Sequence, residues 1–169
     1  MEIFRTKLCE AGIKGARTYV ADFLSDDFPE ADFDVVYALA IFHHFKHIET
    51  FLDALAQRMS NGGIAITQDP IQTRIPIKLM RLVYRPLQTD AAWEFPFTRN
   101  SLDAIQRKFK VEPIQGIYGY SKWAIPISIF NPKLAGHYAQ RWHMRDVRYA
   151  TELNTIRSCL QASFMLRKE

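Results

Sequence analysis

Residues 33–70 read FDVVYALAIFHHFKHIETFLDALAQRMSNGGIAITQDP. The stretch opens on a near-continuous apolar run, residues 33–42, which is typical of a strand buried on both faces of a parallel sheet. Residues 46–59 repeat apolar side chains at helical spacing, so they predict an amphipathic helix that ends at Asn61-Gly62-Gly63 in a left-handed cap. A second strand follows at residues 64–68. Strand, helix and strand in this order predict an α/β fold with a mostly parallel sheet.

Residues 70–97 connect this unit to the next predicted helix. Four prolines separate short apolar pieces in the segment, which is longer than an ordinary connection. Long connections of this kind tend to be lids or binding loops. We therefore expect a lid or substrate-binding region here.

The first domain is predicted to end at residue 132. Thr98 can cap a helix, and two strands follow at residues 111–118 and 121–130 with a two-residue link between them. Such a short link predicts an antiparallel strand pair. Residues 133–169 carry apolar side chains at helical spacing and are expected to form a basic helical extension.

The composition limits the possible classes of protein. The chain has 22 basic and 18 acidic residues, and residues 133–169 hold the whole excess. A basic excess in one segment is most often a solvated helix face, and the alternative is weak attraction to anionic surfaces. A nucleic-acid-binding domain would instead spread basic residues over a working face, so we expect no nucleic-acid partner. No uncharged apolar run approaches the roughly 18 residues of a membrane span. Cys9 and Cys159 fit reduced thiols in a cytoplasmic protein.

Three motifs, taken in order, resemble those of the Rossmann-like (class I) S-adenosylmethionine-dependent methyltransferases. They are Val20-Ala21-Asp22-Phe23, the strand with a histidine-rich end at residues 33–45, and Asn61-Gly62-Gly63 in place of the usual Pro-Gly-Gly. The resemblance covers roughly residues 1–130. It implies a sheet of order 3-2-1-4-5-7-6 and S-adenosylmethionine as the cofactor.

The resemblance also implies cofactor contacts. Asp22 and Phe23 would lie against the adenine. Ala40, Ile41 and His43 would flank the methionine part of the cofactor.

The glycine-rich loop of the family has no counterpart in this chain, because its seven glycines form no G-x-G. That loop and an acidic residue after the second strand normally hold the cofactor. The chain therefore resembles the C-terminal two-thirds of a methyltransferase and is expected to be truncated. Without the first two strands, residues 18–23 lose their neighbours and residues 33–42 become an exposed edge. We expect self-association or completion by a partner segment through this edge.

Methyl transfer mainly requires that the protein align donor and acceptor and exclude water. A general base is needed when the acceptor must first lose a proton. His43 and His44 follow one buried strand and Asp69 follows the next, so all three are candidate catalytic residues at the edge where open α/β sheets bind ligands. Either imidazole could be the base, since it exchanges protons near neutral pH. The alternative is that His44 caps the next helix and His43 packs through its backbone.

The lid carries four candidates for acceptor binding, namely Arg81, Tyr84, Arg85 and Trp93. The arginines would favour an anionic or carboxylated acceptor. The alternative is that the two aromatic side chains fill the core beneath the loop while the arginines are solvated.

The expected function is S-adenosylmethionine-dependent methyl transfer to a small-molecule acceptor, with the activity of this chain alone left open. One alternative is a non-catalytic methyltransferase remnant that acts as an interaction subunit. A second is a small metal-dependent hydrolase built on His43, His44 and His47. The glutamate of H-E-x-x-H is missing from that cluster, so we expect no metal site.

Overall fold

The computed structural model describes residues 2–89 and 91–169, apart from the side chains at positions 2, 4, 83, 84 and 87. The chain divides into two compact units, Met1–Glu30 and Ala31–Glu169.

The first unit contains helix α1 (Glu2–Glu10). Gly12 and Gly15 follow it with positive φ. An ion pair of 2.7 Å joins Arg17 to Glu30. The expected strand at residues 18–23 does not form. Its physical reason is that a strand needs a hydrogen-bonded neighbour, and these residues pair with no strand.

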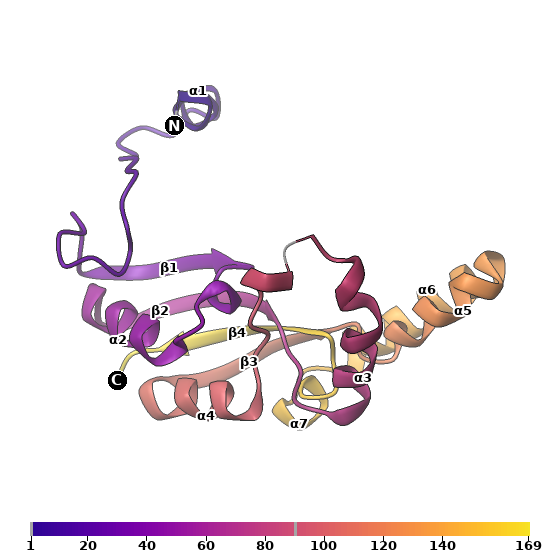
Figure 1. Cartoon of the computed structure of the whole chain (residues 1–169). Coiled ribbons are helices and arrows are strands. Elements are labelled where there is room, and N and C mark those ends of the chain that lie inside the picture. The colour runs from indigo at the N-terminus through magenta and orange to yellow at the C-terminus, as the bar shows by residue number, and fades with distance from the viewer. Residues whose placement is uncertain (1, 90) are drawn as a thin grey trace. The chain divides into compact units, whose positions relative to one another are not determined.

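The second unit is built on a sheet of four strands (Figure 1). They are β1 (Phe33–Leu39), β2 (Met59–Pro70), β3 (Lys110–Ile117) and β4 (Gln161–Arg167). The spatial order is β1-β2-β4-β3, with β1 parallel to β2 and with β4 antiparallel to both of its neighbours. This arrangement equals the 4-5-7-6 half of the sheet that the resemblance implies, and it confirms the α/β class.

Helices connect these strands and cover the sheet. They are α2 (Ile48–Arg58), α3 (Ile75–Tyr84), α4 (Arg99–Lys108), α5 (Ala124–Phe130), α6 (Pro132–Tyr149) and α7 (Leu153–Ile156), with short 3-10 turns η1 (Phe42–His44), η2 (Arg85–Leu87), η3 (Ala91–Trp93) and η4 (Ser121–Trp123). The expected cap of α4 is confirmed, because the Thr98 side chain accepts a hydrogen bond from Ser101 N. Helices α2 and α4 pack against each other, and an ion pair of 2.9 Å joins Arg107 to Glu49.

The antiparallel strand pair is present, but its second strand was assigned to the wrong segment. Residues 121–130 form η4 and α5, and the strand that pairs with β3 is β4. The helical interpretation of residues 133–169 holds for α6 and α7 and is wrong for β4. Ala162, Phe164 and Leu166 are buried at every second position of this strand, which is the period of a sheet.

The helix predicted before the two glycines ends earlier than expected. Helix α2 stops at Arg58, and Met59 is already extended. Gly62 does adopt a positive φ of 76°, but it does so inside β2, where its N–H donates to the carbonyl of Lys168. The left-handed residue therefore belongs to the start of the strand and is not the cap of the helix.

Strand β1 is an edge of this sheet, as expected from the motifs. Val35, Tyr37 and Leu39 are exposed along it, whereas Ala38 is buried. Among the residues that the structure describes, no helix is both long enough and apolar enough to span a bilayer.

Candidate functional site

The site begins where β1 ends. Ala40 adopts a left-handed conformation with a φ of 53°, and its N–H donates to the carbonyl of Gln68 on β2 at 2.9 Å. A non-glycine residue pays roughly 1 kcal/mol or more in this region, and such residues cluster at functional sites. The turn leads directly into η1, where Phe42 is fully buried against Phe51 with ring centroids 4.6 Å apart. Phe42 thereby anchors the residue that follows it.

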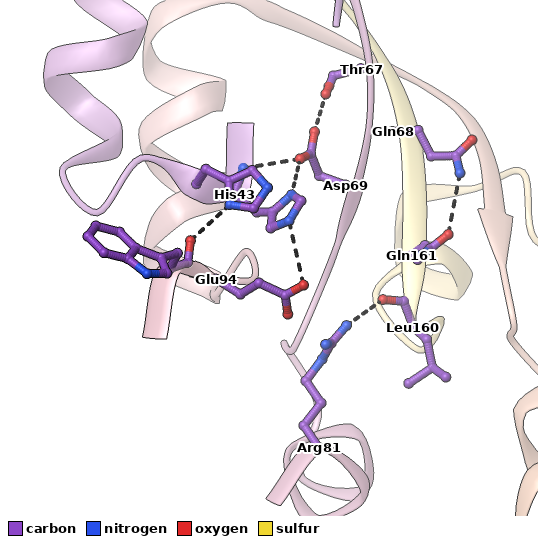
Figure 2. A network of polar contacts seen from close by, with 10 residues as sticks. His43, Thr67, Gln68, Asp69, Arg81, Glu94, Leu160 and Gln161 are labelled. Carbon is purple, nitrogen blue, oxygen red and sulfur yellow. Dashed lines mark hydrogen bonds and ion pairs between the residues drawn. The ribbon is translucent and has the colours of Figure 1, made fainter. Parts of the chain in front are cut away.

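His43 is buried and paired with a carboxylate at the end of β2. Its Nδ1 lies 2.7 Å from Oδ1 of Asp69, which also accepts a hydrogen bond of 3.1 Å from His43 N (Figure 2). The second oxygen of Asp69 accepts a hydrogen bond from the Thr67 hydroxyl. A carboxylate at Nδ1 keeps a proton on that nitrogen and leaves Nε2 as the acceptor of the neutral ring. The predicted pair of His43 and Asp69 is thus brought together, and His43 does more than pack through its backbone.

Glu94 approaches the other nitrogen of this imidazole. Its Oε1 lies 4.0 Å from Nε2 of His43 (Figure 2). Its Oε2 accepts a hydrogen bond of 3.1 Å from Gln88. Both Glu94 and Gln88 lie in the segment 70–97 that was expected to be a lid. Sequence reasoning missed Glu94 because a single acidic residue between Trp93 and Phe95 carries no periodic signal.

Two further hydrogen bonds join the segment 70–97 to His43 and His44. The N–H of Phe95 donates to the carbonyl of His43 at 2.7 Å, and Nδ1 of His44 lies 2.9 Å from the carbonyl of Trp93. His44 therefore does not cap α2. The N-cap residue of that helix is His47, whose side chain makes no capping hydrogen bond.

A cavity of about 520 Å³ lies beside these groups. Its walls come from the ends of β1, β2 and β3, from the segment 70–97, from α5 and from the start of β4. The lining residues are Ala40, His43, His44, Gln68, Pro70, Arg81, Gln88, Glu94, Tyr118, Ile125, Leu160 and Gln161. Gln68 donates to Gln161 across the sheet at 3.3 Å (Figure 2). The cavity therefore joins two imidazoles, a carboxylate, a guanidinium and three amides to apolar side chains, a mixture that is typical of small-molecule sites.

The four predicted acceptor-binding residues take different positions. Arg81 is buried and lines the cavity, and its guanidinium donates to the carbonyl of Leu160 at 2.9 Å (Figure 2). Arg85 is exposed and donates to the carbonyl of Ala91 within the lid. Trp93 is exposed, so its ring does not fill the core. The side chain of Tyr84 lies outside the described residues.

The predicted cofactor contacts fall in both units. Ala40 and His43 line the cavity, and Ile41 between them is exposed. Asp22 and Phe23 belong to the first unit, where the Asp22 carboxylate accepts a hydrogen bond from Leu24 N and the Phe23 ring packs against Phe28.

A second polar cluster joins α6 to the turn after β3. The Asp146 carboxylate is buried and accepts hydrogen bonds from the backbone N–H groups of Gly119, Tyr120 and Ser121 at 2.5–3.0 Å. Beside it, burial lowers the pKa of Lys122 and raises the pKa of the Cys159 thiol to about 11. The hydrogen bonds of Asp146 hold the C-terminal half of α6 beside the turn after β3.

The structure offers no support for the metal-dependent hydrolase. Within residues 2–89 and 91–169, no three histidine, cysteine or acidic side chains converge in a way that could hold a metal ion. His43 instead uses Nδ1 to bind Asp69.

The sequence was compared with known protein families. Residues 1–67 match the family model described as "Methyltransferase domain". The resemblance to the methyltransferases is confirmed. No curated protein matches the chain in sequence. The matched segment of this methyltransferase-like chain contains the left-handed turn at Ala40, His43 and most of β2.

Solved structures share the methyltransferase fold over nearly the whole chain. The YcgJ protein from Bacillus subtilis is 13% identical, with a TM-score of 0.59 over 99% of this chain and 77% of that protein. An O-methyltransferase family protein from Burkholderia thailandensis is 9% identical, with a TM-score of 0.58 over 99% of this chain and 40% of that one. The DszA carbon methyltransferase is 13% identical, with a TM-score of 0.55 over 97% of this chain and 36% of that one. At such identities the likeness concerns the fold.

Proposed function

We propose that the chain catalyses S-adenosylmethionine-dependent methyl transfer to a hydroxyl group of a small molecule bound beside His43. The observation that supports this most is the contact between His43 and Asp69. It directs Nε2 of the imidazole away from Asp69. The ring lies at the sheet edge where open α/β folds bind their ligands. Methyltransferase function in general is supported by the family match and by the fold.

His43 acts as the general base in this proposal. Its Nε2 accepts the proton of the acceptor hydroxyl as the oxygen becomes a nucleophile. Asp69 is a positioning residue, because it fixes the tautomer and stabilises the imidazolium through the 2.7 Å contact. Glu94 supports the same charged form from the other side at 4.0 Å. Proton transfer of this kind contributes typically ~10²–10⁴-fold to a rate.

The cavity fits the cofactor that the family implies. When bound, S-adenosylmethionine supplies an electrophilic methyl group on a positively charged sulfonium. The Glu94 carboxylate lines the cavity and suits a cation, and Ala40 brings only a methyl side chain to its wall. We assign Ala40, Ile41 and His43 of the second unit to the methionine part. The contact of Asp22 and Phe23 with the adenine, which the resemblance implies, stays a prediction. The cytoplasmic location expected from two reduced thiols stays a prediction.

The first experiment is a calorimetric titration of the 169-residue chain with S-adenosylhomocysteine. Saturable one-site binding supports the proposal. Transfer of label from radioactive S-adenosylmethionine to a panel of phenols, sugars and hydroxy acids then tests the reaction. We expect His43→Ala to lower the rate by about a hundredfold or more. His47→Ala is the matched control, because His47 is exposed and its side chain makes no capping hydrogen bond at the start of α2.

Two outcomes contradict the proposal. Equal rates for His43→Ala and the wild type would remove His43 as the base. Folded protein that binds no S-adenosylhomocysteine would show that the chain alone is no enzyme, and it would favour the interaction subunit.

A further inference from the structure

Helix α5 exposes apolar side chains at its C-terminal end. Phe130 has 88% of its surface exposed and Ile129 has 76%, and Leu134 on the first turn of α6 is also exposed. In Figure 1 these two helices extend away from the four strands. We call Ile129, Phe130 and Leu134 the apolar tip. Exposed apolar groups that gather in one place usually mark a contact surface.

A row of basic side chains runs along α6 from this tip. Lys133, His137, Arg141 and Arg148 are exposed and follow one another at intervals of four, four and seven residues, so they share one face of the helix. Among the described residues, no salt bridge involves Lys133, Arg141 or Arg148. These charges are therefore available to an external partner.

The surface charge of this region has no local compensation. Residues 124–149 contain four lysines and arginines and one acidic residue, Asp146. The Asp146 carboxylate is buried and accepts backbone hydrogen bonds, so it does not face the cationic row. An apolar tip beside uncompensated positive charge is complementary to a bilayer that carries anionic headgroups.

We propose that α5 and α6 dock the protein on the surface of an anionic membrane. The apolar tip enters the headgroup boundary, and Lys133 and Arg141 contact lipid phosphates. Ile125, one turn before Ile129 on the same helix, lines the candidate cavity, so docking brings that cavity close to the lipid surface. The proposal does not depend on the methyltransferase reaction, because binding can be measured without cofactor or acceptor.

The test is co-sedimentation of the 169-residue chain with vesicles. We expect it to sediment with phosphatidylcholine vesicles that contain phosphatidylglycerol, and to stay in the supernatant with phosphatidylcholine alone. Ile129→Ser with Phe130→Ser should abolish most of the binding. Lys133→Gln and Arg141→Gln should each weaken it by about fivefold, since one cation near an anionic surface contributes that much. Salt at 0.5 M should release the wild type.

Ile3→Ser is the matched control, because Ile3 is also 76% exposed on a short helix and lies outside the proposed surface. Circular dichroism establishes that each variant is folded. Equal binding by the tip variant and by Ile3→Ser would overturn the proposal, as would equal binding to neutral and anionic vesicles. If the tip variant instead changes only the oligomeric state without vesicles, the surface binds protein and the proposal is wrong.

Discussion

The Nδ1 atom of His43 lies 2.7 Å from Oδ1 of Asp69, although 26 residues separate the two in the sequence. The parallel pairing of β1 and β2 causes this proximity, because it carries both strand ends to the same edge of the sheet. The contact is buried and the same carboxylate also accepts from His43 N and from Thr67. Stability and reactivity at this edge therefore depend on one side chain.

Asp69→Ala should lower the free energy of unfolding by about 2–4 kcal/mol, because it leaves buried donors without an acceptor. Urea denaturation measures the change. Asp53→Ala is the control, since Asp53 forms an exposed ion pair with Lys108 and should cost less than about 1 kcal/mol. Equal losses in the two variants would contradict a structural role for Asp69.

Gly116→Ala should destabilise the protein by about 1–3 kcal/mol. A Cβ at this position would lie 2.5 Å from Sγ of Cys159 and 3.1 Å from Cβ of Ala150, so the core must shift. Gly136→Ala offers the opposite case, because nothing lies within 4 Å and the residue is inside α6. It should stabilise by about 0.5–1 kcal/mol. Denaturant midpoints of the two variants should move in opposite directions.

The Cys159 thiol should resist alkylation at pH 8, where the exposed Cys9 reacts. Burial raises the pKa of Cys159 from 9.0 to about 11, so the folded state holds the proton that the unfolded state loses. The stability from this thiol is complete below pH 9 and is lost as the pH rises toward 11. The wild type should thus lose more stability than Cys159→Ala over that interval. If the stability of the two proteins depends on pH in the same way, the raised pKa of Cys159 is contradicted.

The β1 edge should promote self-association, because Tyr37 is 66% exposed on a strand with unpaired backbone groups. We expect a sedimentation coefficient that rises with protein concentration. Tyr37→Lys should reduce this dependence. Leu79→Lys, at an exposed position of helix α3, should leave it unchanged. A wild type that stays monomeric at all concentrations would disprove the expectation.

Periodicity predicted the elements whose pattern extends over many residues. The order strand, helix, strand of β1-α2-β2 follows from its apolar runs and its amphipathic helix, but β1 is not buried on both faces as expected, because it forms the edge of the sheet. The position of His43 beside Asp69 follows from the parallel pairing. A short apolar run fits a strand as well as a helix. For this reason the sequence predicts a strand where α5 forms and a helix where β4 forms. Glu94 could not be found from sequence because only the folding of the lid brings it to His43.

The strand that comes last in the chain connects the two other parts of the sheet. Strand β4 lies between β2 and β3, and these two strands have no other pairing between them. During synthesis, β1, α2 and β2 can associate early, but β3 must wait for residues 161–167 to emerge from the ribosome. Until then the open sides of β2 and β3 are exposed to other chains. A nascent chain that pauses near residue 150 would therefore depend on a chaperone to stay free of aggregation.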